Sequence, residues 1–247
     1  MMKRATYFLL IAAIFSFHIL INYQILKSSQ IARIHDESSR IVTGLFYYNS
    51  VVFNPNLSIV KKLDTFLTLD KDQSHPHLFE IVEALSWKIL NMIKIKDNVD
   101  SMILIANSIF LLILLISVYG IGSELYNRNI GLLSAFLTSV LPLAFAHTRI
   151  AMLDYPLMCM LSLSIWLLLK TNRFHSPGYS VLTGIVFGLS QLTKETFIIF
   201  IVAPVIYYFI KSYSSEKKRG IVLNFMLAMA FFAAIAATVY LHPPNLK

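Results

Sequence analysis

Residues 101–123 read SMILIANSIFLLILLISVYGIGS, a stretch of 23 residues without a charged side chain. A helix that crosses the hydrocarbon core of a bilayer needs about 20 mostly apolar residues, because the core is roughly 30 Å thick and each residue rises about 1.5 Å. The stretch is long enough to meet this requirement. It therefore predicts a transmembrane helix, and with it an integral membrane protein.

The composition of the 247 residues agrees with this prediction. Hydrophobic residues make up 57% of the chain and charged residues 14%, and the mean hydropathy is +0.67. Because soluble domains carry about 25% charged residues, a soluble globular protein, a disordered tail and a disulfide scaffold are all but excluded. The single Cys159 offers no cysteine-based metal site. The net charge of +8 suits loops that face an anionic leaflet better than it suits nucleic-acid binding.

Uncharged stretches predict about seven transmembrane helices in a single membrane domain over residues 1–247. The first is expected to remain as a signal-anchor helix, because its apolar stretch is long and lacks a small-residue cleavage site. The fourth and sixth are short and need a boundary residue to reach full length. The predicted spans are Ala5–Leu26, Ser101–Ser123, Asn129–Thr148, Tyr155–Leu169, Phe174–Thr193, Thr196–Ile210 and Gly220–Leu241.

Positive charges orient these spans. With the N-terminus in the cytoplasm, the inner segments hold nine basic residues against Glu124 and Glu216, whereas the first loop, residues 27–100, holds nine basic and nine acidic residues. We therefore expect a multi-pass protein of the plasma (inner) membrane with this long loop outside. The inner basic residues are Lys3, Arg4, Arg128, Lys170, Arg173, Lys211, Lys217, Lys218 and Arg219.

The long first loop is not typical of a disordered segment. Apolar residues recur at helical spacing from Ile41 to Phe46 and again from Leu78 to Met92, where Glu80, Glu83 and Lys88 are interleaved with them. Two amphipathic helices along the outer membrane surface are expected. Trp87 and Tyr47–Tyr48 are expected to anchor them at the interface.

Four groups of ionisable residues fall on the outer side of this topology. They are Asp36–Glu37, His75-Pro76-His77, His147 with Arg149 and Asp154, and Lys194–Glu195. Ionisable groups are costly near a membrane, which makes them candidates for function. Each group also has a plainer explanation: a helix cap, a surface turn before a helix, a structural ion pair and the end of a hairpin. The two histidines would need a third ligand to hold a metal.

These residue types suit transfer of a group from a lipid-linked phosphate donor. A carboxylate can act as general base toward an acceptor, and basic groups such as Arg149, Lys194 and a protonated His75 can hold the leaving phosphate. A donor with a polyprenyl tail stays in the bilayer and requires a site at its surface. A transporter is a weaker alternative, since transporters place ionisable groups near the midplane of the membrane.

Five segments in order resemble the N-terminal half of GT-C membrane glycosyltransferases, in the branch of protein O-mannosyltransferases and the lipid A aminoarabinose transferase. Residues 35–40 (HDESSR) resemble the acidic motif that follows the first span. Residues 74–78 (SHPHL) resemble the H/K-P-P-L motif, although His77 replaces its second proline. The other matching segments are 125–133 (LYNRNIGLL), 148–156 (TRIAMLDYP) and 184–195 (GIVFGLSQLTKE).

The resemblance implies an enzyme that transfers a hexose or pentose, with inversion, from a polyprenyl-phosphate donor. The acceptor would be a protein, a lipid or a glycan on the extracytoplasmic side. Asp36 would be the general base with Glu37 beside it, Asp154 would line the same cavity, and His75 would contact the lipid phosphate. No cofactor is certain. A divalent metal would have Asp36, Asp154 and His77 as candidate ligands.

The same resemblance bears on length, since members of this class are about twice as long as this chain. The C-terminal part of the family is therefore expected to be absent. The alternative function that follows is a truncated, non-catalytic membrane subunit that binds polyprenyl lipid or a partner protein.

Overall fold

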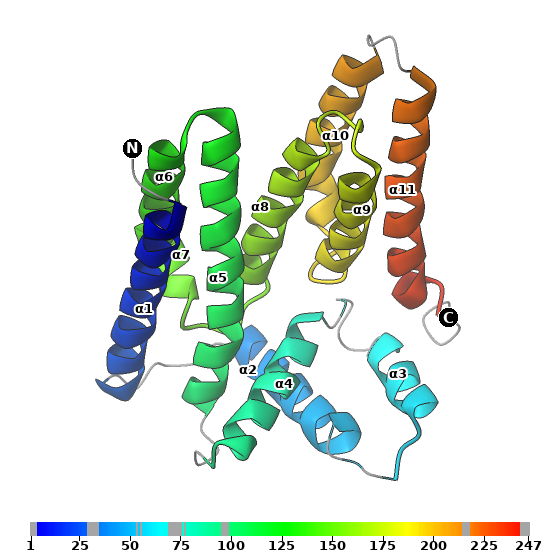
Figure 1. Ribbon diagram of the computed structural model, residues 1–247. Helices are drawn as coiled ribbons and strands as arrows, with labels where there is room; N and C mark the ends of the chain where they lie inside the picture. The colour runs from blue at the N-terminus through cyan, green and yellow to red at the C-terminus, as the bar shows by residue number, and fades with distance from the viewer. Residues whose placement is uncertain are drawn as a thin grey trace. The chain divides into compact units, whose positions relative to one another are not determined.

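The computed structural model describes residues 4–28, 35–52, 54, 56–68, 76, 78–94, 99–213 and 218–242. All regular structure in these residues is helical (Figure 1), which confirms the predicted all-α class. Among the described residues, three helices are long and apolar enough to cross a membrane. They are α1 (Arg4–Ser28), α5 (Val99–Leu125) and α11 (Lys218–Tyr240).

The other four predicted spans are also helical, but they are shorter. The third is divided into α6 (Arg128–Val140) and α7 (Pro142–His147), because the residue before a proline is pushed out of the helical region and Leu141 has φ −54° and ψ 130°. The remaining helices are α8 (Asp154–Lys170), α9 (Pro177–Gln191) and α10 (Phe197–Tyr213). Each predicted stretch thus forms helix, while the number of spans stays a prediction.

The described residues group into two compact units. The first contains those up to Phe66 and those from Leu78 to Pro156. The second contains those from Leu157 onward, together with Leu67, Thr68 and Pro76.

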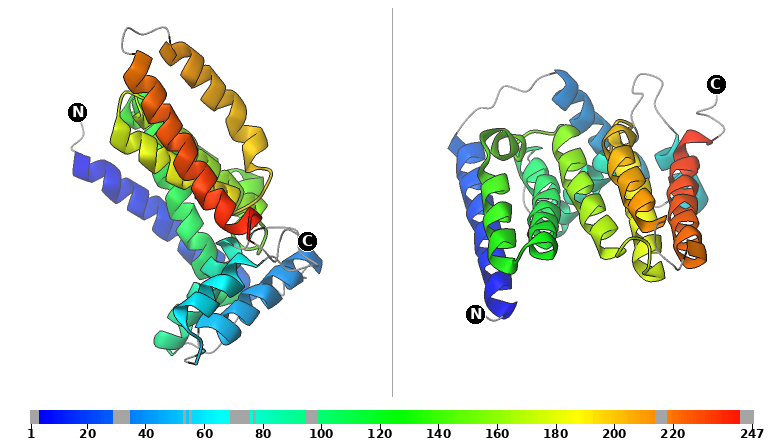
Figure 2. Two further views of the ribbon diagram at one scale, coloured as in Figure 1. Left: turned by 90° about the vertical axis from the view of Figure 1, so that its right-hand side faces the viewer. Right: turned by 90° about the horizontal axis from the view of Figure 1, so that it is seen from above.

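Helix α5 organises the first unit, since it packs against α1, α4 and α6 (Figures 1 and 2). Its approach to α6 is close because two glycines face each other: a Cβ on Gly122 would lie 2.6 Å from the Cα of Gly131. A polar contact joins α1 to α6, where Nε2 of the buried His18 lies 3.0 Å from Oγ of Ser139. Small residues and paired polar groups therefore hold these helices together, as is common between membrane helices.

Between α1 and α5, the described residues of the first unit also form three α-helices and one π-helix. Helix α2 (His35–Tyr47) continues into the π-helix η1 (Tyr48–Val52), and α3 (Ile59–Leu67) and α4 (Leu78–Met92) follow. Helix α2 packs on α4, and there the rings of Tyr48 and Trp87 lie 6.2 Å apart between their centroids. Trp87, Tyr47 and Tyr48 are buried, so the prediction that they anchor helices at the membrane interface is wrong: they lie inside the protein, where Tyr48 of η1 contacts Trp87 of α4.

The two faces of α4 differ from an ordinary amphipathic helix. Its acids Glu80 and Glu83 are fully buried together with the apolar Phe79, Trp87 and Leu90, whereas three other apolar residues, Leu85, Ile89 and Met92, are exposed. The acids face the protein because α2 covers that side of the helix. The three exposed apolar residues are left on the outer side, where a helix beside a membrane would meet lipid.

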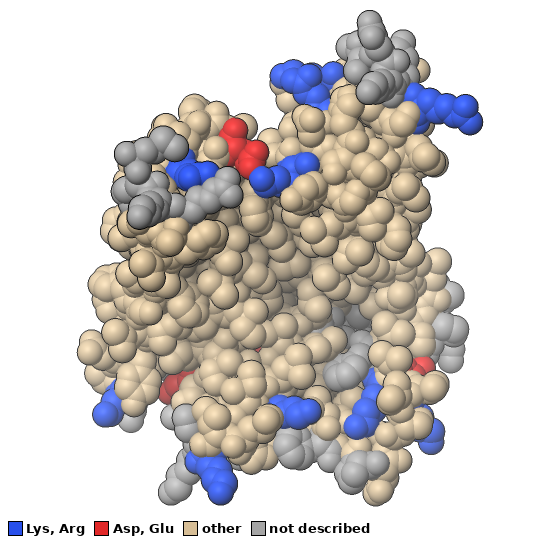
Figure 3. Space-filling model, viewed as in Figure 1, with Lys and Arg blue, Asp and Glu red and all other residues tan. Residues whose placement is uncertain are grey.

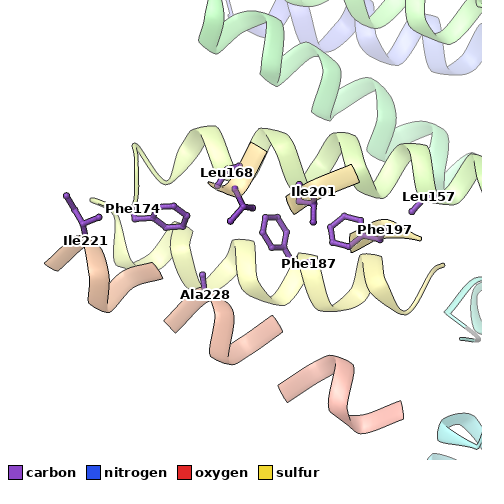
Figure 4. Close-up of a cluster of buried hydrophobic side chains, with 9 residues drawn as sticks. Leu157, Leu168, Phe174, Phe187, Phe197, Ile201, Ile221 and Ala228 are labelled. Atoms are coloured by element: carbon purple, nitrogen blue, oxygen red, sulfur yellow. The ribbon is translucent and has the colours of Figure 1, made fainter. Parts of the chain in front are cut away.

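The second unit is built around a cluster of aromatic and aliphatic side chains. Phe187 of α9 lies between Leu168 of α8 and Phe197 and Ile201 of α10 (Figure 4). Further along the cluster, the Nδ2 of Asn224 donates to the carbonyl oxygen of Phe174 at 2.8 Å and ties α11 to the turn after α8. The cluster joins all four helices of this unit.

The helix surfaces are those of a membrane protein. On the face that Figure 3 shows, the sides of the long helices are almost entirely uncharged, and Lys and Arg side chains gather near helix ends. Large apolar side chains are exposed on α1 and α10, among them Phe8, Leu9, Ile199 and Phe200. Apolar side chains in such positions are favourable where the surrounding solvent is hydrocarbon.

The contact between α9 and α11 gives a test of this packing. A Cβ on Gly184 would lie 2.9 Å from the backbone Cα of Ala228, whereas a Cβ on Gly178 of the same helix would meet nothing within 4 Å. Alanine in a helix is otherwise more favourable than glycine by roughly 0.5–1 kcal/mol. We therefore expect Gly184→Ala to lower the thermal unfolding midpoint in detergent and Gly178→Ala to leave it unchanged or slightly higher. Equal midpoints would contradict the close approach of α9 to α11.

Candidate functional site

The turn between α7 and α8, residues 148–153, is held by a side chain from α5. Asn107 is 1% exposed. Its Nδ2 donates to the carbonyl oxygens of His147, Thr148 and Ile150 at 3.3, 3.2 and 3.0 Å. Carbonyl groups at the end of a helix lack intrahelical partners, so Asn107 supplies the donor that the end of α7 and the turn need.

The same turn is held from α2. Glu37 is 1% exposed, and its Oε1 accepts the backbone N–H of Ala151 at 3.2 Å. Its neighbour Asp36 is exposed. Both acids lie in the first turn of α2, where the helix dipole favours negative charge, so the simpler explanation of a helix cap is compatible with a functional one. The hydrogen bond brings the start of α2 to the turn that carries Arg149 and leads to Asp154.

Arg149 is oriented by contacts with α1 and α7. Its NH1 donates to Oδ1 of Asn22 at 2.9 Å, and its guanidinium carbon lies 4.5 Å from the centroid of the Phe145 ring. Partial burial lowers the pKa of Arg149 from its ordinary value, but an arginine remains charged at neutral pH. A guanidinium has five N–H donors, so the bond to Asn22 fixes its direction and uses one of them.

The structure thus places Asp36, Glu37, Arg149 and Asp154 in the first unit, around one turn. Asp154 is exposed and begins α8. His147 ends α7, and its backbone carbonyl is one of those bound by Asn107. An acid that reaches solvent, a second acid that is buried and an oriented guanidinium are the groups that general-base chemistry beside a phosphate requires.

Lys194 belongs to the second unit. It lies with Glu195 between α9 and α10, and both are half-buried. Nε2 of Gln191 donates to the carbonyl oxygen of Glu195 at 3.1 Å and lies 3.4 Å from the hydroxyl of Tyr240. These contacts hold the turn of Lys194 to the end of α11. The predicted phosphate contact His75 and the candidate metal ligand His77 lie outside the described residues.

The metal prediction rests on oxygen and nitrogen ligands from separate segments. Within the described ranges, no group of three or more His, Cys, Asp or Glu residues is arranged to hold a metal ion. Asp36 and Asp154 offer carboxylate oxygens at exposed positions. We therefore assign no step of the chemistry to a metal.

Sequence reasoning did not single out Asn107 and Asn22, which hold the turn and its arginine. The sequence does mark both residues, since each is a polar residue inside a predicted transmembrane stretch, where an unpaired polar group is costly. Asn107 lies in the uncharged stretch 101–123. Only the structure identifies the carbonyl groups that it binds.

The fold and the turn define a helical membrane protein with acids and an arginine gathered around one connection. Comparison with known families then identifies it further: the chain belongs to the dolichyl-phosphate-mannose-protein mannosyltransferase family, whose model matches residues 82–238, more than half of the chain. A comparison with curated proteins gave no match. The resemblance noted from the motifs is thereby confirmed, and the family is one of glycosyltransferases. The matched range includes Arg149, Asp154 and Lys194.

The role of Asn107 can be tested by reversing its hydrogen-bonding character. Asn107→Asp would place carboxylate oxygens against three carbonyl oxygens and remove their donor, which costs about 1–3 kcal/mol or more for buried groups. We expect a lower thermal unfolding midpoint in detergent. The matched control is Ser108→Ala on the same helix, because the hydroxyl of Ser108 donates within α5, to the carbonyl of Leu104. If both variants unfold like the unaltered chain, Asn107 does not hold the turn.

Proposed function

We propose that the chain transfers a sugar from a polyprenyl-phosphate-linked donor to an acceptor on the extracytoplasmic side of the inner membrane, with Asp36 as general base. The observation that carries this proposal is the hydrogen bond from the backbone N–H of Ala151 to Glu37, at 3.2 Å. Through this bond, an acidic helix start and a basic turn that are more than 100 residues apart become neighbours. The family assignment supports the same chemical class.

The difference in exposure between two adjacent acids supports Asp36 over Glu37 as the base. Glu37 is buried and engaged with the backbone at Ala151, whereas Asp36 is exposed. A general base has to come within hydrogen-bond reach of the proton that it removes. The exposed position of Asp36 leaves it open to an acceptor, and Glu37 is better suited to position the helix that carries it.

The reaction would proceed as a single displacement. The carboxylate of Asp36 accepts the proton of an acceptor hydroxyl while the hydroxyl oxygen forms a bond to the anomeric carbon of the donor sugar. The bond between that carbon and the phosphate oxygen breaks, and the polyprenyl phosphate leaves with the electron pair. One displacement inverts the anomeric centre, and no sugar becomes attached to the enzyme.

Basic side chains would stabilise the negative charge that develops on the leaving phosphate. Arg149 is suited to this role because its guanidinium is oriented by Asn22 and binds phosphate oxygens in a bidentate manner. Lys194 and His75 are the further candidates from the sequence, and Asp154 would line the cavity. The donor would keep its tail in the bilayer, where the apolar faces of the helices meet lipid.

The orientation follows from the charges of the loops. Nine basic residues against two acidic ones fall in the segments assigned to the cytoplasm, and the loop with Asp36 is balanced. The N-terminus would thus be cytoplasmic and the site extracytoplasmic. Acceptors of the protein, lipid and glycan classes all carry hydroxyl groups that the proposed base can activate.

The test compares two aspartates in the first loop. In membranes that contain the full chain, supplied with dolichyl-phosphate mannose labelled in the sugar, Asp36→Asn is expected to lower transfer of label to membrane acceptors by about 100-fold or more. The substitution keeps the size of the side chain and removes the base. The control Asp64→Asn removes an exposed carboxylate from α3 and is expected to keep the activity.

Protein amount and thermal unfolding are measured for each variant so that a folding defect is recognised. Retained transfer by Asp36→Asn would exclude this residue as the base. If the unaltered, folded chain binds the labelled donor and transfers no sugar, the non-catalytic lipid-binding subunit replaces the enzyme as the better assignment.

A further inference from the structure

The contact between α2 and α4 contains three buried carboxyl groups. Glu80 and Glu83 of α4 are fully buried, and Glu37 of α2 is 1% exposed. Charged side chains are rarely buried unless they are paired, because removing an ion from water is costly. These acids need a physical explanation, and the transfer chemistry proposed above uses neither Glu80 nor Glu83.

An arginine compensates one of the acids. NH1 of Arg40 lies 2.7 Å from Oε1 of Glu80, and both side chains are largely buried, with Arg40 12% exposed. Arg40 lies three residues after Glu37 and four residues before Gly44, so the three share one face of α2. That face is turned to α4, which contributes Glu80 and, one turn later, Glu83.

Glu83 fills the space above Gly44. A Cβ on Gly44 would lie 2.6 Å from Oε2 and 2.9 Å from Cβ of Glu83. Both carboxyl oxygens of Glu83 are buried, and they have no hydrogen-bond partner among the described residues. An ionised carboxylate in such a place would lose its hydration without compensation.

The charges around Glu83 also oppose its ionisation. Of the described residues, the charged groups that act on it are Arg40 and Glu37 from α2 and Glu80 from α4 itself, whereas α5 and η1, which also pack on α4, contribute none. Burial, followed by the charge of Glu80, raises the pKa of Glu83 well above its ordinary value. Arg40 partly offsets this rise, and Glu37 adds to it.

We propose that Glu83 is a positioning residue in its protonated, neutral form. It fills the space over Gly44, while the Arg40–Glu80 ion pair ties α2 to α4. In this form Glu83 adds no charge to the contact between the two helices. Loss of the proton would place a negative charge beside Glu80 and Glu37, with no hydrogen-bond partner among the described residues to compensate it, and would weaken the contact. The consequence for catalysis rests on the proposed function, because Asp36 and Glu37 lie at the start of the helix that is held.

The sign of the pH dependence follows from the raised pKa. The folded chain keeps the proton of Glu83 at pH values where the unfolded chain has lost it. Stability from this group is therefore fully present below the ordinary pKa of about 4.3. It declines as the pH rises through the folded-state value.

The experiment measures the thermal unfolding midpoint of the full chain in detergent from about pH 5 to about pH 9, across the range in which a buried glutamate titrates. Glu83→Gln keeps the shape and stays neutral, so it is expected to remove part of the decline toward high pH. The difference in unfolding midpoint between the variant and the unaltered chain should grow in favour of the variant by about 3–5 °C for each pH unit below the folded-state pKa. Glu124→Gln, at an exposed position in α5, is the control and should follow the unaltered chain.

A second pair of variants tests the contact itself and serves if Glu83→Gln folds poorly. Gly44→Ala is expected to lower the midpoint because its methyl group would overlap Glu83, and adding Glu83→Ala in the same chain is expected to restore part of the loss. The proposal is overturned if Glu83→Gln shows the same pH profile as the unaltered chain, or if the two substitutions act additively.

The pH dependence of the rate of sugar transfer provides a further measurement, which a purely structural role of Glu83 would leave unchanged. With labelled dolichyl-phosphate mannose as donor, Glu83→Gln is expected to keep the activity at neutral pH and extend it to higher pH. Unfolding is measured without a donor, so the two proposals fail separately. If Glu83→Gln changes the pH dependence of unfolding as expected but the chain transfers no sugar, only the proposed enzymatic function is contradicted. If the chain transfers sugar but Glu83→Gln leaves the pH dependence of unfolding unchanged, only the proposed role of Glu83 is contradicted.

Discussion

Buried polar groups have to find partners within the protein, because water does not reach them. The turn between α7 and α8 depends on this constraint. Its carbonyl groups are bound by the Asn107 amide and its Ala151 N–H by Glu37. Since the partners come from α5 and α2, satisfying one short turn also fixes where two helices lie. The position of Arg149 within the turn follows from the same bonds.

The loop helices show how this constraint changes an ordinary amphipathic pattern. In a soluble protein the apolar face of α4 would be buried and its acids would face water. Here the side turned to α2 and α5 buries Glu80 and Glu83 beside the apolar Phe79, Trp87 and Leu90, while Leu85 and Ile89 are exposed on the other side. The burial of these acids is tolerated because Arg40 pairs with one of them and the pKa of the other is raised.

The sequence was sufficient for the helical class and for the long apolar helices, because long uncharged stretches and positive loops report directly on the membrane. It did not predict the short helix α3 in the first loop. It also placed Asp36, Glu37 and Arg149 among the candidates. It did not reveal the role of Asn107, whose partners are backbone groups about 40 residues away. Trp87 was assigned to the membrane interface for a related reason: periodicity identifies two faces of a helix and does not say which one another helix will cover.

Adjacent acids at the start of a helix can serve two purposes because successive side chains point about 100° apart around the axis. If Glu37 is directed into the protein and held by Ala151, Asp36 is directed away from that contact, and its exposure agrees with this. The buried acid then limits the motion of the exposed one through the shared backbone. A base placed in this way loses little freedom when a substrate binds, which is the condition under which orientation contributes to rate. Under the proposed function, Asp36 would therefore be the base and Glu37 its support, and the two carboxylates would not be interchangeable.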